Sequence, residues 1–158
     1  MATLSPLCQL NGGCMGCCGH DFGTKEQIKE AIRENTAEFQ IAHLQTEQQF
    51  LAFRDRAHPF DLRYGVCRNL IEEKGCNLCP LHPTRHRGKD LRINHCDVNY
   101  LCKTATLFST WNKQQQEEFI QFIETKKLDN LTYSIVMDNN TLFGEFLEHE
   151  KIHCKIVL

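Results

Sequence analysis

Cysteine is the residue type that most constrains how this chain folds. It occurs ten times in 158 residues, and nine of the ten lie at or before position 102. In secreted proteins clustered cysteines form disulfide frameworks, whereas in a reducing compartment they hold metals or perform redox chemistry. Residues 1–13 carry neither the basic start nor the apolar run of a secretory signal, so we expect a water-soluble, cytoplasmic protein whose cysteines bind metal. The cysteines are Cys8, Cys14, Cys17, Cys18, Cys67, Cys76, Cys79, Cys96, Cys102 and Cys154.

The segment from His58 to Cys102 is rich in Pro, Gly, Cys, His and Arg and has weak periodicity of either the helical or the strand kind. A stretch of about 45 residues with little regular structure is uncommon inside a compact domain. Something other than an apolar core must therefore hold it, and metal coordination is the obvious candidate.

Two helices are predicted before this segment. Thr24-x-x-Gln27 and Thr46-x-x-Gln49 both have the form of a capping box, and each precedes apolar residues at helical spacing. The first helix is expected to fray near Asn35.

After Cys102 the sequence predicts an amphipathic helix over Asn112–Lys127, capped by Ser109 or Thr110. Thr132–Met137 is rich in β-formers, and Lys151–Leu158 alternates enough to form a closing strand that contains Cys154 as a small apolar residue. Leu142–Glu148 fits either a helix or a strand. We therefore expect one small α+β domain over residues 1–158, with several helices, a small C-terminal β element and irregular, metal-stapled cysteine-rich segments. Residues 8–102 would form the metal-binding part and residues 103–158 the helix and strand part.

The first candidate site is the motif Cys14-Met15-Gly16-Cys17-Cys18. A Cys-x2-Cys pair can turn both sulfurs onto one ion at about 2.3 Å, and flanking glycines permit the tight backbone of such a knuckle. Cys18 would point elsewhere, toward a second metal or toward none.

The remaining candidate ligands lie in the irregular segment. Cys76-x2-Cys79 followed by proline forms a second knuckle, and the other groups nearby could complete a tetrahedron of four thiolates, or of three thiolates and one imidazole. The spacing leaves open which ligands share an ion and whether there are one or two ions. The full set of candidate ligands is Cys14, Cys17, Cys18, Cys67, Cys76, Cys79, His82, Cys96 and Cys102, with Cys8 undecided.

Basic residues make the middle segment locally cationic. Four thiolates around one divalent ion leave a net negative charge, so we expect these cations to balance thiolate charge. A phosphate or other anion site beside the metal is the alternative. The residues are Arg63, Arg68, Arg85, Arg87, Lys89 and Arg92.

The cysteine pattern resembles the YkgJ-type family of zinc- or iron-chelating cysteine-rich proteins over residues 8–102. Cys14, Cys17 and Cys18 match the last three cysteines of that family's first motif, and Cys67 with Cys76 matches the start of its distal segment. Asn11 stands where the family has its first cysteine. The resemblance implies metal chelation and names no activity.

Zinc bound by cysteine thiolates, with possible histidine, is thus the expected cofactor, at a structural site or one of unknown activity. The alternatives are an iron or iron–sulfur redox protein, a metal-dependent enzyme, a zinc-stapled interaction module and a disulfide-stapled secreted domain. A net charge of −2 and a pI near 6.4 argue against nucleic acid as a partner. No apolar run approaches the length of a membrane span. No macromolecular partner is indicated.

Overall fold

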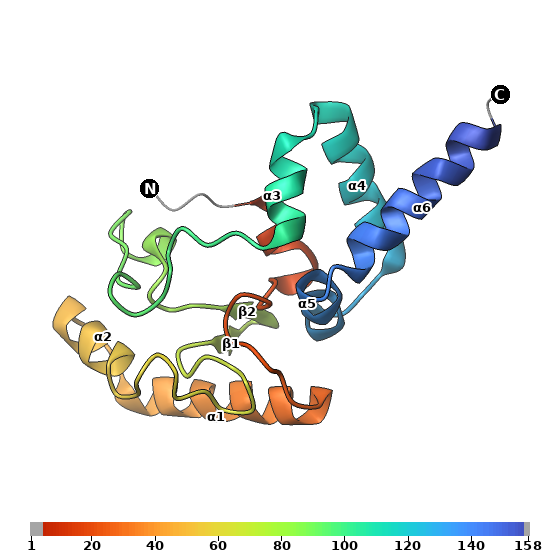
Figure 1. Ribbon diagram of the computed structural model, residues 1–158. Helices are drawn as coiled ribbons and strands as arrows, with labels where there is room; N and C mark the ends of the chain where they lie inside the picture. The colour runs from red at the N-terminus through yellow and green to blue at the C-terminus, as the bar shows by residue number, and fades with distance from the viewer. Residues whose placement is uncertain (1–4, 157–158) are drawn as a thin grey trace. The chain divides into compact units, whose positions relative to one another are not determined.

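The computed structural model describes residues 5–156 and the side chains as far as Lys151 (Figure 1). These residues form helices and one two-stranded antiparallel sheet, which confirms the predicted α+β class. They divide into two compact units. Unit 1 comprises residues 18–100, and unit 2 comprises residues 5–17 with residues 101–156. The expectation of a single domain stays a prediction, and each unit is described by itself.

Unit 1 is built on α1 (Lys25–Ala42) and α2 (Glu47–Arg54). Both predicted capping boxes are present, with Thr24 and Thr46 accepting from the backbone N–H three residues on. The expected fraying near Asn35 is wrong, because the Asn35 side chain is fully buried and hydrogen bonded, and α1 continues for seven more residues to Ala42.

The irregular segment of unit 1 contains a short hairpin, β1 (Ile71–Glu73) and β2 (Cys76–Leu78), and the 3-10 turn η2 (Pro83–Arg85). Strand β1 lies against α1. The residues before the hairpin pair with the start of the unit through an isolated antiparallel bridge, Gly19 to Val66. Gly19 has φ +143°, and a Cβ there would lie 1.9 Å from the carbonyl oxygen of Gly65, so only glycine fits at this crossing.

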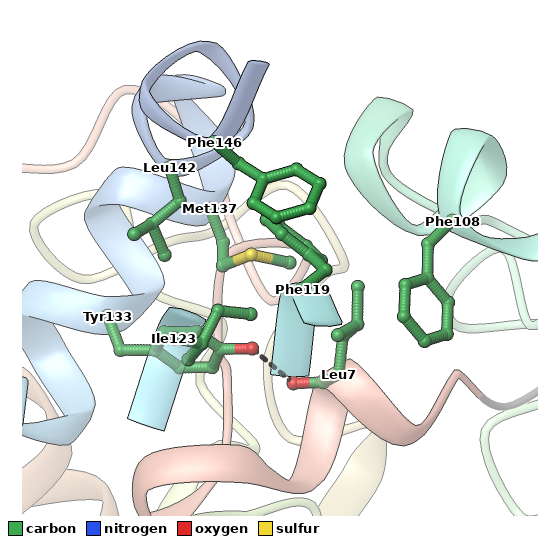
Figure 2. Packing of buried hydrophobic residues seen from close by; sticks show 8 residues of the cluster. All are labelled: Leu7, Phe108, Phe119, Ile123, Tyr133, Met137, Leu142 and Phe146. Carbon is green, nitrogen blue, oxygen red and sulfur yellow. Dashed lines mark hydrogen bonds between the residues drawn. The ribbon is translucent and has the colours of Figure 1, made fainter. Parts of the chain in front are cut away.

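Unit 2 consists of the 3-10 segment η1 (Pro6–Gly12) and four helices, α3 (Lys103–Thr110), α4 (Lys113–Lys126), α5 (Asn130–Asp138) and α6 (Thr141–Ile156). Their apolar faces meet in one core, and Figure 2 shows the Tyr133 hydroxyl donating to the Leu7 carbonyl oxygen at 2.7 Å. The chain start is therefore anchored in the helical core of unit 2. The core residues are Leu7, Phe108, Phe119, Ile123, Tyr133, Met137, Leu142 and Phe146.

The prediction of a C-terminal β element is wrong. Thr132–Met137 lies inside α5, because Asp129 caps this helix and its buried side chains recur at helical spacing; packing has overridden the β propensity of single residues. Lys151–Ile156 continues α6, while residues 157–158 and the Cys154 side chain lie outside what is described.

Two further predictions concern α6 and α4. Leu142–Glu148, which fits either structure in sequence, is helical. The predicted helix over Asn112–Lys127 is α4, but its cap is Asn112 rather than Ser109 or Thr110, which end α3.

Candidate metal centre

Cluster A comprises Cys8, Cys14, Cys17 and Cys102, all in unit 2. The Cys14 N–H donates to the Cys8 carbonyl oxygen at 2.9 Å, which closes the η1 loop and brings these two residues together. The Gly16 N–H then donates to Cys14 Sγ at 3.5 Å. This N–H···S bond marks a tight turn after Cys14, and Cys17, the second member of the predicted Cys-x2-Cys pair, is exposed.

Cys102 joins cluster A from a distant part of the sequence. It is the N-cap of α3, where its Sγ accepts from the Ala105 N–H at 3.4 Å. The positive end of a helix dipole favours negative charge at this position. Cys14 and Cys102 both pack against the unit 2 core, so the rigid helices position both sulfurs.

Burial and neighbouring thiols shift the pKa values of two cysteines in cluster A. Burial raises the pKa of Cys14 to about 12; the Gly16 amide opposes this rise, and negative charge on Cys17 and Cys8 adds to it. Burial likewise raises the pKa of Cys8, and charge on Cys17 and Cys102 raises it further. The pKa of Tyr133 is raised by burial and then by Cys14, Cys8 and Cys102. The thiols of Cys8 and Cys14 are therefore protonated at neutral pH unless a cation lies beside them.

The loop between Cys8 and Cys14 carries a buried polar atom without a partner. Asn11 Nδ2 is buried and has no hydrogen-bond partner among the described residues. Asn11 lies in the loop that the Cys8–Cys14 hydrogen bond closes, with φ 52°. A buried amide donor without an acceptor costs about 1–3 kcal/mol.

Cluster B comprises Cys67, Cys79 and Cys96, all in unit 1. Cys79 is half-buried. Burial raises the pKa of its thiol to about 12, the Leu81 amide opposes this rise, and negative charge on Cys67 and Cys96 raises the pKa further. The pKa of Arg92 is raised chiefly by its ion pair with Asp90 and then by Cys96 and Cys79. A guanidinium therefore lies within electrostatic reach of two of the three thiols.

Three predicted ligands belong to neither cluster, namely Cys18, Cys76 and His82. Cys18 is half-buried, and its carbonyl oxygen accepts from the Cys67 N–H at 2.8 Å. Cys76 is exposed in the hairpin, paired with Glu73 in the ladder. His82 caps η2, and its Nδ1 accepts from the Thr84 N–H at 3.3 Å and lies 2.8 Å from Thr84 Oγ1. The proton of a neutral His82 ring is then on Nε2, which leaves no lone pair for a metal.

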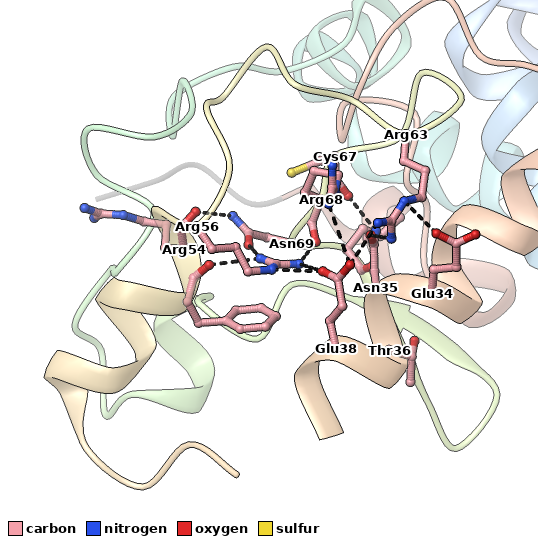
Figure 3. A network of polar contacts seen from close by, with 12 residues as sticks. Glu34, Asn35, Thr36, Glu38, Arg54, Arg56, Arg63, Cys67, Arg68 and Asn69 are labelled. Atoms are coloured by element: carbon pink, nitrogen blue, oxygen red, sulfur yellow. Dashed lines mark hydrogen bonds and ion pairs between the residues drawn. The ribbon is translucent and has the colours of Figure 1, made fainter. Parts of the chain in front are cut away.

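The basic residues of the middle segment pair mainly with carboxylates. Figure 3 shows Arg56 and Arg63 donating to the two oxygens of Glu38 at 2.8 Å each, and Arg68 lies 3.6 Å from the same carboxylate. Burial alone would raise the pKa of Glu38, but the hydrogen bonds from Arg63 and Arg56 hold it below its ordinary value. The same pairing recurs outside this network: Arg85 with Glu73, Lys89 with Glu47 and Arg92 with Asp90.

The structure thus brings Cys14, Cys17 and Cys102 together and groups Cys67, Cys79 and Cys96 separately. Spacing alone does not assign Cys8, which joins cluster A through its backbone hydrogen bond with Cys14 and its electrostatic interaction with Cys17 and Cys102. Over the part of the chain that is described, no three cysteine, histidine, aspartate or glutamate side chains are arranged as a ready-made metal site. None of the nine cysteines with described side chains forms a disulfide.

Comparisons with protein-family models, with curated proteins and with solved structures found no match. Within residues 5–156, none of the helices has the length and apolar character needed to cross a membrane.

Proposed function

We propose that this protein binds zinc through the four thiolates of cluster A, as a structural site that joins the chain start to α3. The observation that carries this proposal is the gathering of four cysteines from three segments of unit 2, two of them packed on its core. Thiolate sulfur in fours selects zinc or iron–sulfur chemistry rather than magnesium or calcium. The cysteine pattern shared with YkgJ-type proteins supports the same chemistry.

The donor set fits a tetrahedral thiolate site, although the sulfurs must first converge. Zinc requires each sulfur at about 2.3 Å. Rotation of a cysteine side chain between staggered χ1 positions moves its sulfur by about 3 Å, so a change of rotamer can bring neighbouring sulfurs closer together. The Gly16 and Ala105 amides already donate to two of the sulfurs.

Four protein ligands leave no open coordination position, so this site would stabilise the fold rather than catalyse a reaction. Binding would contribute about 10 kcal/mol or more to the folding of unit 2, because the ligands do not form a site in the unfolded chain. A reducing cytoplasm would keep the thiols available.

The test is elemental analysis with an absorption spectrum, on full-length protein purified anaerobically without chelator. We expect at least one zinc per chain, no visible colour, and the loss of one zinc in Cys14→Ser. The exposed Cys76 lies outside the cluster, so Cys76→Ser is the matched control and should keep the full zinc content. Metal-free wild-type protein, or full zinc in Cys14→Ser, would contradict the proposal, and iron with visible charge-transfer bands would replace zinc by a redox centre.

A further inference from the structure

We propose that unit 1 holds a second zinc ion of its own, bound by Cys18, Cys67, Cys79 and Cys96. This inference extends the proposed function from cluster A to cluster B and adds a fourth ligand, Cys18. It assigns eight of the ten cysteines to two separate tetrathiolate sites, one in each unit.

Cys18 is placed beside Cys67 by backbone pairing. Gly19 and Val66 form an antiparallel bridge, and the Cys67 N–H donates to the Cys18 carbonyl oxygen at 2.8 Å. Cys18 and Cys67 are therefore the next directly opposed pair of this short ladder. Opposed residues of an antiparallel pair carry their side chains on the same face, with Cβ atoms about 4.5–5.5 Å apart. Two sulfurs on one face at that separation suit a common ion.

The other two ligands are tied to this pair by hydrogen bonds between loops. The Leu91 N–H donates to the Leu81 carbonyl oxygen at 3.2 Å, which joins the Cys79 knuckle to the segment that carries Cys96. The Asn69 Nδ2 atom lies 3.1 Å from His95 Nε2, which joins the Cys67 turn to the residue before Cys96. The four cysteine-bearing segments are thus linked within unit 1, and Cys67 and Cys96 each lie within electrostatic reach of Cys79.

The charges around cluster B suit a tetrathiolate ion, which is a dianion. Arg92 is fixed by Asp90, which accepts from its Nε at 2.8 Å and its Nη2 at 2.7 Å, and its charge reaches Cys79 and Cys96. Arg85, paired with Glu73, reaches Cys79 as well. Arginines held in place by carboxylates would offset part of the negative charge without themselves binding the metal.

The first experiment uses the wild-type full-length chain. Native mass spectrometry should find two zinc ions per chain. N-ethylmaleimide labelling with peptide mapping should then be run on zinc-loaded and on EDTA-treated protein. Cys96 and Cys76 are both exposed in this structure, so they form a matched pair of reporters. We expect zinc to slow the labelling of Cys96 at least about tenfold and to leave Cys76 unchanged, because a metal-bound thiolate is a poor nucleophile.

This design separates the two proposals. The exposed Cys17 reports on cluster A in the same labelling run. Zinc protection of Cys17 with no protection of Cys96, at one zinc per chain, overturns the second site and leaves the proposed function standing. Labelling of both at the rate of Cys76 overturns both.

Variants identify the ligands. Cys18→Ser and Cys79→Ser should each bind one zinc, whereas His82→Ala should bind two. Loss of one zinc in His82→Ala with full zinc in Cys18→Ser would overturn the proposed ligand set. If Cys79→Ser fails to fold, the wild-type labelling result for Cys96 still decides whether the second site exists.

Discussion

Replacing Asn35 by alanine tests how the cysteine-bearing loop of unit 1 is held. Asn35 lies on α1 with 0% of its surface exposed. Its Nδ2 donates to the carbonyl oxygens of Cys67 at 2.9 Å and Leu70 at 3.0 Å, and its Oδ1 accepts from Arg63 at 3.0 Å. One side chain thus joins the helix to both ends of the turn that follows Cys67.

The size of the destabilisation depends on which hydrogen-bond partners of Asn35 keep a second hydrogen bond or ion pair after the substitution. The Cys67 carbonyl oxygen also accepts from the Leu70 N–H, and Arg63 also pairs with Glu34 and Glu38, so these groups are only weakened. The Leu70 carbonyl loses its buried donor, at about 1–3 kcal/mol, and the two weakened bonds add about 1 kcal/mol together. We expect Asn35→Ala to lower the free energy of unfolding by about 2–4 kcal/mol.

The assay is urea denaturation followed by far-UV circular dichroism at fixed zinc concentration. Glu34→Gln is the matched control, because Glu34 precedes Asn35 on α1 and makes a half-exposed ion pair with Arg63. That variant should lower the free energy of unfolding by less than about 1 kcal/mol. If the free energy of unfolding of Asn35→Ala lies within about 0.5 kcal/mol of the wild-type value, the buried amide does not hold this loop and the reasoning is refuted.

Three further predictions concern single side chains. Tyr133→Phe removes the donor to the Leu7 carbonyl and should cost about 1–2 kcal/mol, measured by the same titration. The pKa of Glu38 in the folded protein lies below its ordinary value of 4.5, so its ion pairs stabilise the fold above that pH, and this stabilisation is lost as the pH falls through the lower folded pKa. Glu38→Gln should lower the free energy of unfolding by about 1–2 kcal/mol at pH 7, allowing for partial exposure. The difference from wild type should vanish in acid. Gly19→Ala should reduce the yield of folded protein, whereas Gly144→Ala, inside α6 with open space around it, should raise the melting temperature by stabilising the helix by about 0.5–1 kcal/mol.

Sequence patterns that span only a few residues predict the helix starts of this fold. The capping boxes at Thr24 and Thr46 lie within one helical turn, so α1 and α2 begin where the sequence places them. The residues of α5 have β-forming side chains, and only the core around Tyr133 makes them helical. That core is assembled from both ends of the sequence, which short-range patterns do not register.

The same distinction applies to the candidate ligands. The spacing of Cys14 and Cys17 predicts that they form a pair, whereas the place of Cys8 beside Cys14 depends on the hydrogen bond from the Cys14 N–H to the Cys8 carbonyl oxygen. Cys76 and Cys79 have the same Cys-x2-Cys spacing as Cys14 and Cys17, but Cys76 is exposed in the hairpin whereas Cys79 is half-buried. Spacing records which sulfurs can share an ion, and only the three-dimensional arrangement selects those that lie together.

The crossing of Gly19 and Gly65 has a consequence for how this sequence can change over time. A Cβ at Gly19 would meet the Gly65 carbonyl at 1.9 Å, and one at Gly65 would meet the His20 carbonyl at 2.5 Å. Many steric conflicts can be relieved by shrinking the opposing side chain, but both of these contacts are with backbone carbonyl oxygens, which every residue carries. No second-site substitution at either position can therefore rescue the other. A ligand cysteine can be exchanged for histidine over evolutionary time, whereas this pair can be lost only together with the loop that it crosses, so the two glycines are the better marker of distant relatives.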